Sequence, residues 1–111
     1  MYLFVEKWKA RPEWLALSQK EREEYVSKVG QAIEDLLKAG IEIVGFALND
    51  PDTPHRADYR YFSVWKLPDK EFVQKFEQAI EQSGWYHYFE QTNARGELIN
   101  PDAALADMIN L

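Results

Sequence analysis

The chain has no cysteine, which excludes disulfide bonds and thiolate metal sites. It also has no excess of positive charge, because 13 basic residues stand against 19 acidic ones and the formal net charge is −6. An acidic chain without a basic block is a poor match to a phosphate backbone, so we expect no nucleic-acid partner. The apolar runs are too short for a bilayer, so we expect no membrane partner either.

The first residues lack the basic start, apolar stretch and cleavage site of a signal peptide. We therefore expect a cytoplasmic protein, although a chain without cysteine gives no positive sign of its compartment. The length of 111 residues predicts one domain, spanning residues 1–111. A chain of this size buries roughly two thirds of its extended surface and needs no covalent staple.

Aromatic residues are plentiful, at 14% of the chain, with four Trp and six Tyr. Tyr and Trp combine a large apolar surface with one polar tip, and both are common in ligand pockets and interfaces. The same composition also fits a core built from large side chains. Only their positions along the chain can separate the two interpretations.

Hydrophobic periodicity predicts the order of the elements. Period-two alternation predicts strands, which we place at 2–9, 41–48, 59–67 and 85–92. Helical spacing predicts two long helices, which we place at 19–39 and from Asp69 to Gly84. The order βαββαβ is the ferredoxin-like arrangement, an α+β fold with a four-stranded antiparallel sheet and helices on one face.

Capping signals support the helix assignments. Ser18 and Glu21 have the spacing of a capping box, and Asp69 is the expected N-cap of the second helix. "NARGE", at 93–97, reads as a turn. A last short helix is expected from Pro101, within a C-terminal tail at 99–111 that docks on the domain or on a partner. Three apolar residues would make that contact: Leu105, Met108 and Ile109.

The sheet is apolar on both faces, which is unusual for an antiparallel sheet. We expect compact side chains such as Leu3 and Val64 to pack beneath the helices. The opposite row would then be exposed, and it contains Tyr2, Phe4, Glu6, Trp8, Tyr59, Tyr61, Ser63 and Trp65. A patch of that size is rare on a monomer, and a second copy of the sheet is its simplest cover. The pattern therefore predicts a homodimer with its sheets face to face.

The element order, the doubly apolar sheet and the length resemble the dimeric α/β-barrel superfamily. The stretch "PEWLALSQKER" also resembles the darcynin-like families, which have no settled function. The superfamily resemblance implies a cavity between sheet and helices or between paired sheets. Its members include cofactor-free monooxygenases, isomerases, haem enzymes and proteins without known chemistry. None of the better-known catalytic signatures matches this sequence, so the resemblance assigns no catalytic residue.

Two residues are candidates for proton transfer. Glu6 lies in the aromatic row, where desolvation would raise its pKa and suit it to act as a general acid or base. His87 lies in "GWYHYF" and could relay a proton from a pocket. Each also has a structural interpretation: Glu6 as an ion-paired carboxylate at the sheet rim, and His87 as an ordinary hydrogen-bonded histidine.

The loop "NDPDTPHRAD", at 49–58, is rich in Asp and Pro. It lacks the glycine and terminal glutamate of a calcium loop, and one histidine is poor zinc spacing. We therefore expect a solvated, mobile loop, no metal site and no cofactor, with a lid over a site as the remaining alternative.

Two functions remain open. In the first, the protein binds a small aromatic or apolar molecule, as a binding protein or as a cofactor-independent oxygenase or isomerase. Six residues would hold the ligand: Phe4, Trp8, Tyr59, Tyr61, Ser63 and Trp65. In the second, a non-enzymatic dimer uses its aromatic residues only to fill an interface. A cavity that touches Glu6 favours the first, and a solid interface with Glu6 in an ion pair favours the second.

Overall fold

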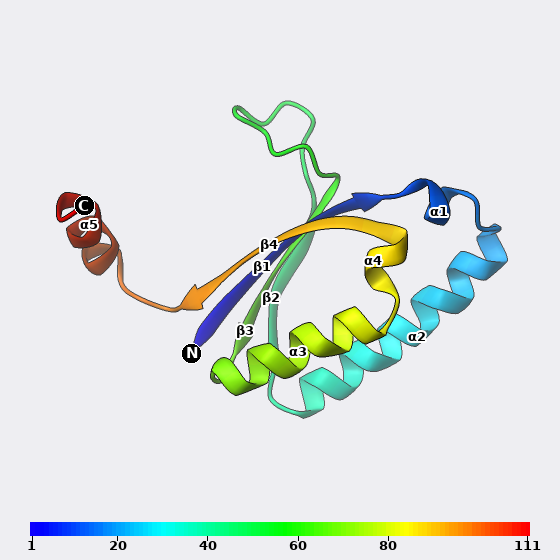
Figure 1. Ribbon diagram of the computed structural model, residues 1–111, viewed down its shortest axis with the longest axis horizontal. Helices are drawn as coiled ribbons and strands as arrows, with labels where there is room; N and C mark the ends of the chain where they lie inside the picture. Colours follow the sequence, from blue (N-terminus) through cyan, green and yellow to red (C-terminus); the bar gives the residue numbers. More distant parts are fainter.

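The computed structural model describes all residues from 1 to 111 as a layer of helices packed on one face of a sheet (Figure 1). Four antiparallel strands lie in the order β2-β3-β1-β4. Their bounds are β1 (Tyr2–Ala10), β2 (Glu42–Leu48), β3 (Tyr61–Leu67) and β4 (Phe89–Glu97). The long helices are α2 (Gln19–Lys38) and α3 (Lys70–Gln82). This architecture confirms the ferredoxin-like α+β fold.

The helix starts follow the capping residues of the sequence. The Ser18 hydroxyl accepts from the Glu21 amide at 3.1 Å, and the Glu21 carboxylate accepts from the Ser18 amide at 2.9 Å. Asp69 accepts from the Phe72 amide at 3.0 Å at the start of α3. Because these side chains satisfy orphan amides of the first turn, they place both helix starts within one residue of the prediction.

The predicted fourth strand is wrong in position. Residues 85–88 form a short helix, α4 (Trp85–Tyr88), and β4 continues through the segment that reads as a turn. Gly84 has a φ of 80°, a left-handed conformation that glycine adopts readily and that separates α3 from α4. The nine residues of β1 each have a partner on β4, so ladder pairing overrides the polar composition of 93–97.

The assignment of the two sheet faces is also wrong. The row with Phe4, Glu6 and Trp8 lies beneath the helices and is buried, whereas Leu3 and Val5 lie on the open face and are half-buried. The large side chains fill the space between sheet and helices. The core cluster beneath the helices consists of Phe4, Ile41, Trp65, Leu67, Val73 and Phe76.

The two helices pack differently on this core. Val73 and Phe76 of α3 are buried, and the Phe76 ring lies 5.2 Å from that of Phe4 and 4.9 Å from that of Trp65. No residue of α2 is buried to that degree, although Ile33 and Leu36 pack against the cluster. α3 therefore packs closely against the sheet, whereas α2 packs less closely and leaves space between itself and the sheet.

The C-terminal segment leaves the domain. Its helix α5 (Pro101–Ile109) begins at Pro101, as predicted, with Asn100 as its N-cap, and lies away from the sheet (Figure 1). Every residue from 99 to 111 is exposed. Docking of this tail on a partner stays a prediction. None of the helices combines the length and the apolar character needed to cross a bilayer.

Candidate functional site

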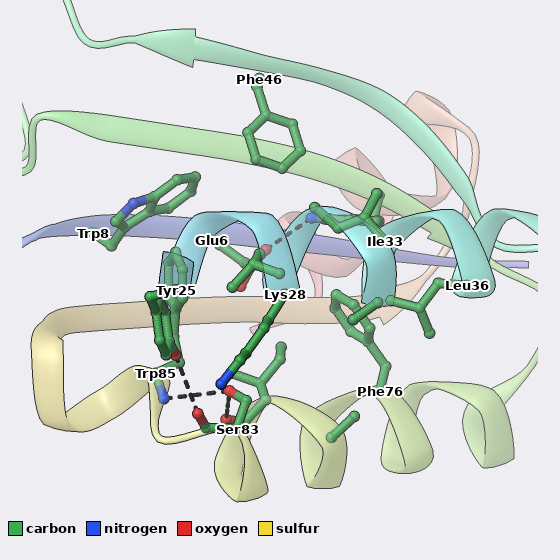
Figure 2. Close-up of a pocket in the computed structure, with 15 residues that line it drawn as sticks. Glu6, Trp8, Tyr25, Lys28, Ile33, Leu36, Phe46, Phe76, Ser83 and Trp85 are labelled. Atoms are coloured by element: carbon green, nitrogen blue, oxygen red, sulfur yellow. Dashed lines mark hydrogen bonds between the residues drawn. The ribbon is translucent and has the colours of Figure 1, made fainter. Parts of the chain in front are cut away.

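A cavity of about 290 Å³ lies between the sheet and the two long helices (Figure 2). Of the 15 residues that line this site cavity, 12 are hydrophobic. The strands contribute Glu6, Trp8, Phe46 and Trp65. The helices and the turn after α3 contribute Tyr25, Lys28, Val29, Ala32, Ile33, Leu36, Phe76, Ala79, Ile80, Ser83 and Trp85. A concave, mostly apolar site with few polar groups is the usual form of a small-molecule pocket.

Aromatic rings form one wall of the site cavity. The Trp8 ring lies 5.8 Å from both Phe46 and Trp85, and Phe46 lies 5.6 Å from Trp65. These pairs have the edge-to-face geometry that aromatic rings favour. The rings hold one another in place, so the wall offers a defined shape to a planar molecule.

Glu6 is the polar centre of the site cavity, with only 6% of its surface exposed. Its Oε1 accepts from the Trp65 indole at 2.7 Å and from the Ser63 hydroxyl at 3.0 Å. Its Oε2 accepts from the Gln91 amide at 2.8 Å. All three donors are neutral, and none of the ion pairs in the structure includes Glu6.

The pKa of Glu6 lies above its ordinary value. Burial is the largest cause, because the charged form loses its hydration inside the protein. The hydrogen bonds from Gln91, Ser63 and Trp65 favour the charged form and pull the pKa down by a smaller amount. The pKa of the carboxyl group is therefore raised, which suits a group that accepts and returns protons.

Gln91 has a fixed orientation in this network. Its Oε1 accepts from the Trp85 indole at 2.7 Å, and its Nε2 donates to Glu6 and also to the Asn93 side chain at 2.8 Å. An indole N–H can only donate, so the amide oxygen must face Trp85 and the amide nitrogen must face Glu6. The orientation therefore follows from the chemistry of its neighbours.

The helix side of the site cavity is more polar near the end of α3. Tyr25 donates to the Ser83 carbonyl at 3.2 Å and ties α2 to α3 (Figure 2). Lys28 is the only basic residue of the lining. It is exposed and takes part in no ion pair, so it marks the solvent-facing part of the cavity.

The structure brings together part of the predicted site. Glu6, Trp8 and Trp65 line the site cavity, and Ser63 contacts it through its bond to Glu6. Phe4 is fully buried in the core beneath.

The other predicted residues lie outside the lining. Tyr61 stacks on the Trp8 ring at 5.6 Å, and Tyr59 lies near Lys9, whose Nζ is 5.5 Å from its ring. His87 is exposed on α4 and is not part of the lining. Glu6 therefore has no histidine partner within the cavity.

Sequence reasoning missed the residues that reach the site from other elements. Gln91 and Trp85 support Glu6, while Tyr25 and Phe46 close the cavity. The register that pairs Trp8 with Gln91 is what brings the amide beside the row of Glu6. Alternation in a correctly placed β4 would have indicated this, because residues two apart share a face.

The 49–58 loop lies away from the lining. The Asn49 side chain donates to the carbonyls of Ala57 and Tyr59, and Arg56 donates to the carbonyls of Asp50 and Asn49. These bonds hold the base of the loop, and none of its residues lines the site cavity. The lid alternative has no contact with the cavity to support it.

Comparisons with known proteins place the chain in a family. A family model described as "Family of unknown function (DUF6616)" matches residues 1–111. No curated protein sequence matched. A solved structure provisionally assigned as the chlorite dismutase TA0507 superposes with a TM-score of 0.63 at 15% identity, covering 89% of this chain and 45% of that one. HapK from Hahella chejuensis gives a TM-score of 0.42 at 20% identity, covering 90% and 94%.

The chain spans less than half the length of the structure with the higher score. At 15% identity that likeness shows the fold alone, and it agrees with the ferredoxin-like arrangement expected from the order of the elements. The darcynin-like resemblance stays a prediction.

Proposed function

The chain belongs to the DUF6616 family of unknown function, and we propose that it binds a small, mostly apolar molecule in the site cavity. Within this proposal Glu6 is the group that exchanges a proton with the ligand. Trp8, Trp65, Phe46 and Trp85 hold the planar body of the molecule by apolar contact. Glu6 is the only acidic residue of the lining.

The observation that carries the proposal is a buried carboxyl group that borders an apolar cavity without an ion pair. A structural carboxylate at such a depth is normally paired, because an isolated charge is costly to bury. Glu6 instead has neutral donors and a raised pKa. Perturbed carboxyl groups in clefts are candidates for function for this physical reason.

The chemistry that Glu6 supports is reversible proton transfer. In an isomerisation, the carboxylate would take a proton from one carbon of an enolisable ligand and return it to another carbon. In an oxygenation, it would take a proton from the ligand before reaction with O₂, the co-reactant. Both schemes need a base of raised pKa in a site shielded from water, and both agree with a cofactor-independent enzyme.

A binding assay tests the proposal before any substrate is known. Ligands that bind only the native state raise its melting temperature, so a screen of planar apolar compounds by thermal shift should return hits. Ala32→Trp places a large side chain in the site cavity and should remove the shift given by each hit. Gln31→Trp is the matched control, because Gln31 is the preceding residue of α2 and lies outside the lining.

The alternative is a non-enzymatic protein whose aromatic residues serve packing alone. Under this alternative, no compound raises the melting temperature, or each compound shifts the melting temperature equally in the Ala32→Trp and Gln31→Trp variants. Either result would reject small-molecule binding in the site cavity.

A further inference from the structure

We infer that the ligand is a planar compound of about two fused rings that presents a neutral O–H or N–H donor to Oε2 of Glu6. This inference rests on the proposed function and deepens it by naming the chemical class of the ligand. Three observations carry it: the unused acceptor position of Glu6, the fixed orientation of Gln91, and the size of the aromatic cavity.

The first observation is a count of hydrogen-bond positions. A carboxylate offers about four acceptor positions, two on each oxygen. Oε1 of Glu6 accepts from two protein donors, whereas Oε2 accepts from Gln91 alone. One acceptor position on Oε2 is therefore unused by protein donors, and Glu6 lines the site cavity.

The second observation concerns the character of the polar contacts around Glu6. Trp65 and Ser63 donate to it, and Gln91 cannot turn its oxygen toward Glu6 without leaving the Trp85 indole unpaired. Every protein group at the carboxylate is thus a donor. An ionised Glu6 is complemented by a ligand donor and repelled by a ligand anion, since no cation lies beside it to offset a second negative charge.

The third observation is size. A dry cavity of about 150 Å³ is enough for benzene. The site cavity has about twice that volume, at 290 Å³, and is lined mainly by apolar side chains. Two fused six-membered rings fit this volume, with the donor at one edge facing Glu6. Lys28 lies at the exposed side, so it does not serve the buried donor.

Gln91 is accordingly a positioning residue for this ligand. It donates to Glu6 but does not itself line the site cavity, and its hydrogen bond favours the charged form of the carboxyl group. Its replacement should raise the pKa of Glu6 further, because one of the bonds that lower that pKa is lost, and it also removes the acceptor of the Trp85 indole.

The test compares three naphthalenes of matched size: 2-naphthol, 2-methoxynaphthalene and 2-naphthoate. Binding is measured above the midpoint of the pH titration of 2-naphthol affinity, where Glu6 is ionised, by calorimetry and by quenching of tryptophan fluorescence, which reports on the site because Trp8, Trp65 and Trp85 line it. A hydrogen bond to a charged group predicts that 2-naphthol binds at least ~10-fold more tightly than the methyl ether. 2-Naphthoate should bind more weakly than 2-naphthol. Glu6→Gln should abolish the preference for the alcohol.

The role of Gln91 has its own measurement. 2-Naphthol affinity should rise with pH as Glu6 ionises, and Gln91→Leu should move the midpoint of that rise to higher pH. Thr92→Leu is the matched control, because Thr92 follows Gln91 on the strand and points to the other face. An unchanged midpoint in Gln91→Leu would overturn the positioning role.

The possible results distinguish failure of the proposed function from failure of the inferred ligand class. If no naphthalene binds, this inference is wrong, and the proposed function fails with it only if the thermal-shift screen also returns no ligand. If 2-methoxynaphthalene or 2-naphthoate binds as tightly as 2-naphthol, the cavity binds ligands but the donor rule is wrong. If 2-naphthol is preferred and Glu6→Gln keeps that preference, the donor contacts another group and the inference is also wrong.

Discussion

Glu6 shows how one residue can be tolerated in a row that otherwise demands apolar side chains. Its neighbours along the row are Phe4 and Trp8, and its cross-strand partner on β3 is Ser63. Ser63 is small enough to leave room for the carboxyl group and polar enough to donate to it. The Trp65 indole donates to both Ser63 and Glu6, so the aromatic row itself satisfies the carboxylate.

The raised pKa of Glu6 predicts a pH-dependent loss of stability. Below its unfolded pKa, the group is protonated in both states and folding has no charge to bury. As pH climbs through the unfolded pKa toward the higher folded pKa, ionisation increasingly favours the unfolded chain, and the full penalty holds above the folded pKa. Thermal melts at pH 5 and pH 8 should therefore show a larger fall for the natural protein than for Glu6→Gln.

The comparison between the two pH values matters more than the stability of Glu6→Gln at either one. The new amide would place a donor against the Gln91 amide, and this mismatch gives an offset that is independent of pH. Glu71→Gln is the control, because Glu71 is exposed on α3 and forms only a surface pair with Lys75. Equal falls for the natural protein and Glu6→Gln would show that the carboxyl group titrates alike in both states.

At the scale of the elements, α2 and α3 differ in how firmly they hold the sheet. α3 buries Val73 and Phe76, whereas α2 has no buried residue and lines one side of the site cavity. Local opening costs less free energy where fewer apolar side chains are buried. We predict that amides in the middle of α2 exchange with solvent faster than those in the middle of α3, by hydrogen exchange detected by mass spectrometry or NMR.

A bound ligand should change this pattern. It would contact the sheet, α2 and α3, and it should slow exchange in α2 by more than in α3 because α2 is the less buried helix in the free protein. Equal protection of the two helices in the free protein would contradict the view that α2 is the looser wall of the cavity.

The 49–58 loop should be mobile only at its tip. Asn49 and Arg56 hold the base through bonds to backbone carbonyls, whereas residues 51–55 are exposed. Fast amide exchange is expected for Asp52 and His55, and slower exchange for Tyr59, whose amide donates to the Ala57 carbonyl at 2.8 Å. Arg56→Ala should extend the fast region to the base, while Arg60→Ala should not. Slow exchange at the tip would show that the loop is ordered throughout.

Periodicity in the sequence was enough to predict the fold but not the faces of the sheet. Alternation sorts Phe4 and Leu3 into different rows whichever row meets the helices. The choice depends on the distance between the layers, which is a tertiary property. Here the Trp and Phe row fills the gap, and the compact row with Leu3 and Val5 lies opposite.

The candidate site was predicted only in part, because some of its residues are brought together by tertiary contacts that local patterns do not reveal. Glu6 stood out because a carboxylate interrupts an aromatic row, and that is a local signal. Gln91 carries no such signal, because a glutamine on a strand is ordinarily a solvent-facing residue. Its role depends on the pairing of β1 with β4 and on a hydrogen bond from the Trp85 indole. Trp85 lies in the short helix α4, whereas the alternation of 85–92 predicted a strand there.

At the scale of the whole molecule, we predict a homodimer formed through the open sheet face. Leu3, Val5, Phe62 and Val64 give that face an apolar centre, and none of the long helices covers it (Figure 1). Sedimentation at micromolar concentration should give twice the chain mass of 13.1 kDa. Val64→Glu should shift the protein toward monomer, because it places a charge at the centre of the contact.

Val26→Glu is the control for that variant, since Val26 is exposed and belongs to α2, a helix on the other face of the sheet (Figure 1). Trp65 is unsuitable for this test, because it is buried beneath the helices and a charge there would damage the fold instead of the contact. A monomer at micromolar concentration in the natural protein would reject the dimer.

The tail gives the last prediction, that α5 packs on the second copy. A free helix of nine residues is marginal in water, and its apolar residues Leu105, Met108 and Ile109 are 54%, 63% and 83% exposed. The chain beyond Arg95 has acidic residues and no basic one, whereas Lys7 and Lys66 on the open face form no ion pair. Both the apolar stripe and the charge therefore suit the open face of a partner.

Met108→Glu should weaken the dimer by ~10-fold or more, because it buries a charge at that contact. Ala103→Glu, on the opposite side of α5, should leave the dimer nearly unchanged. The dimer dissociation constant is measured by sedimentation, with exchange at the α5 amides followed alongside. Protected α5 amides in a monomer would place the tail on its own domain. Equal dissociation constants for the natural protein and Met108→Glu would show that the tail takes no part in assembly.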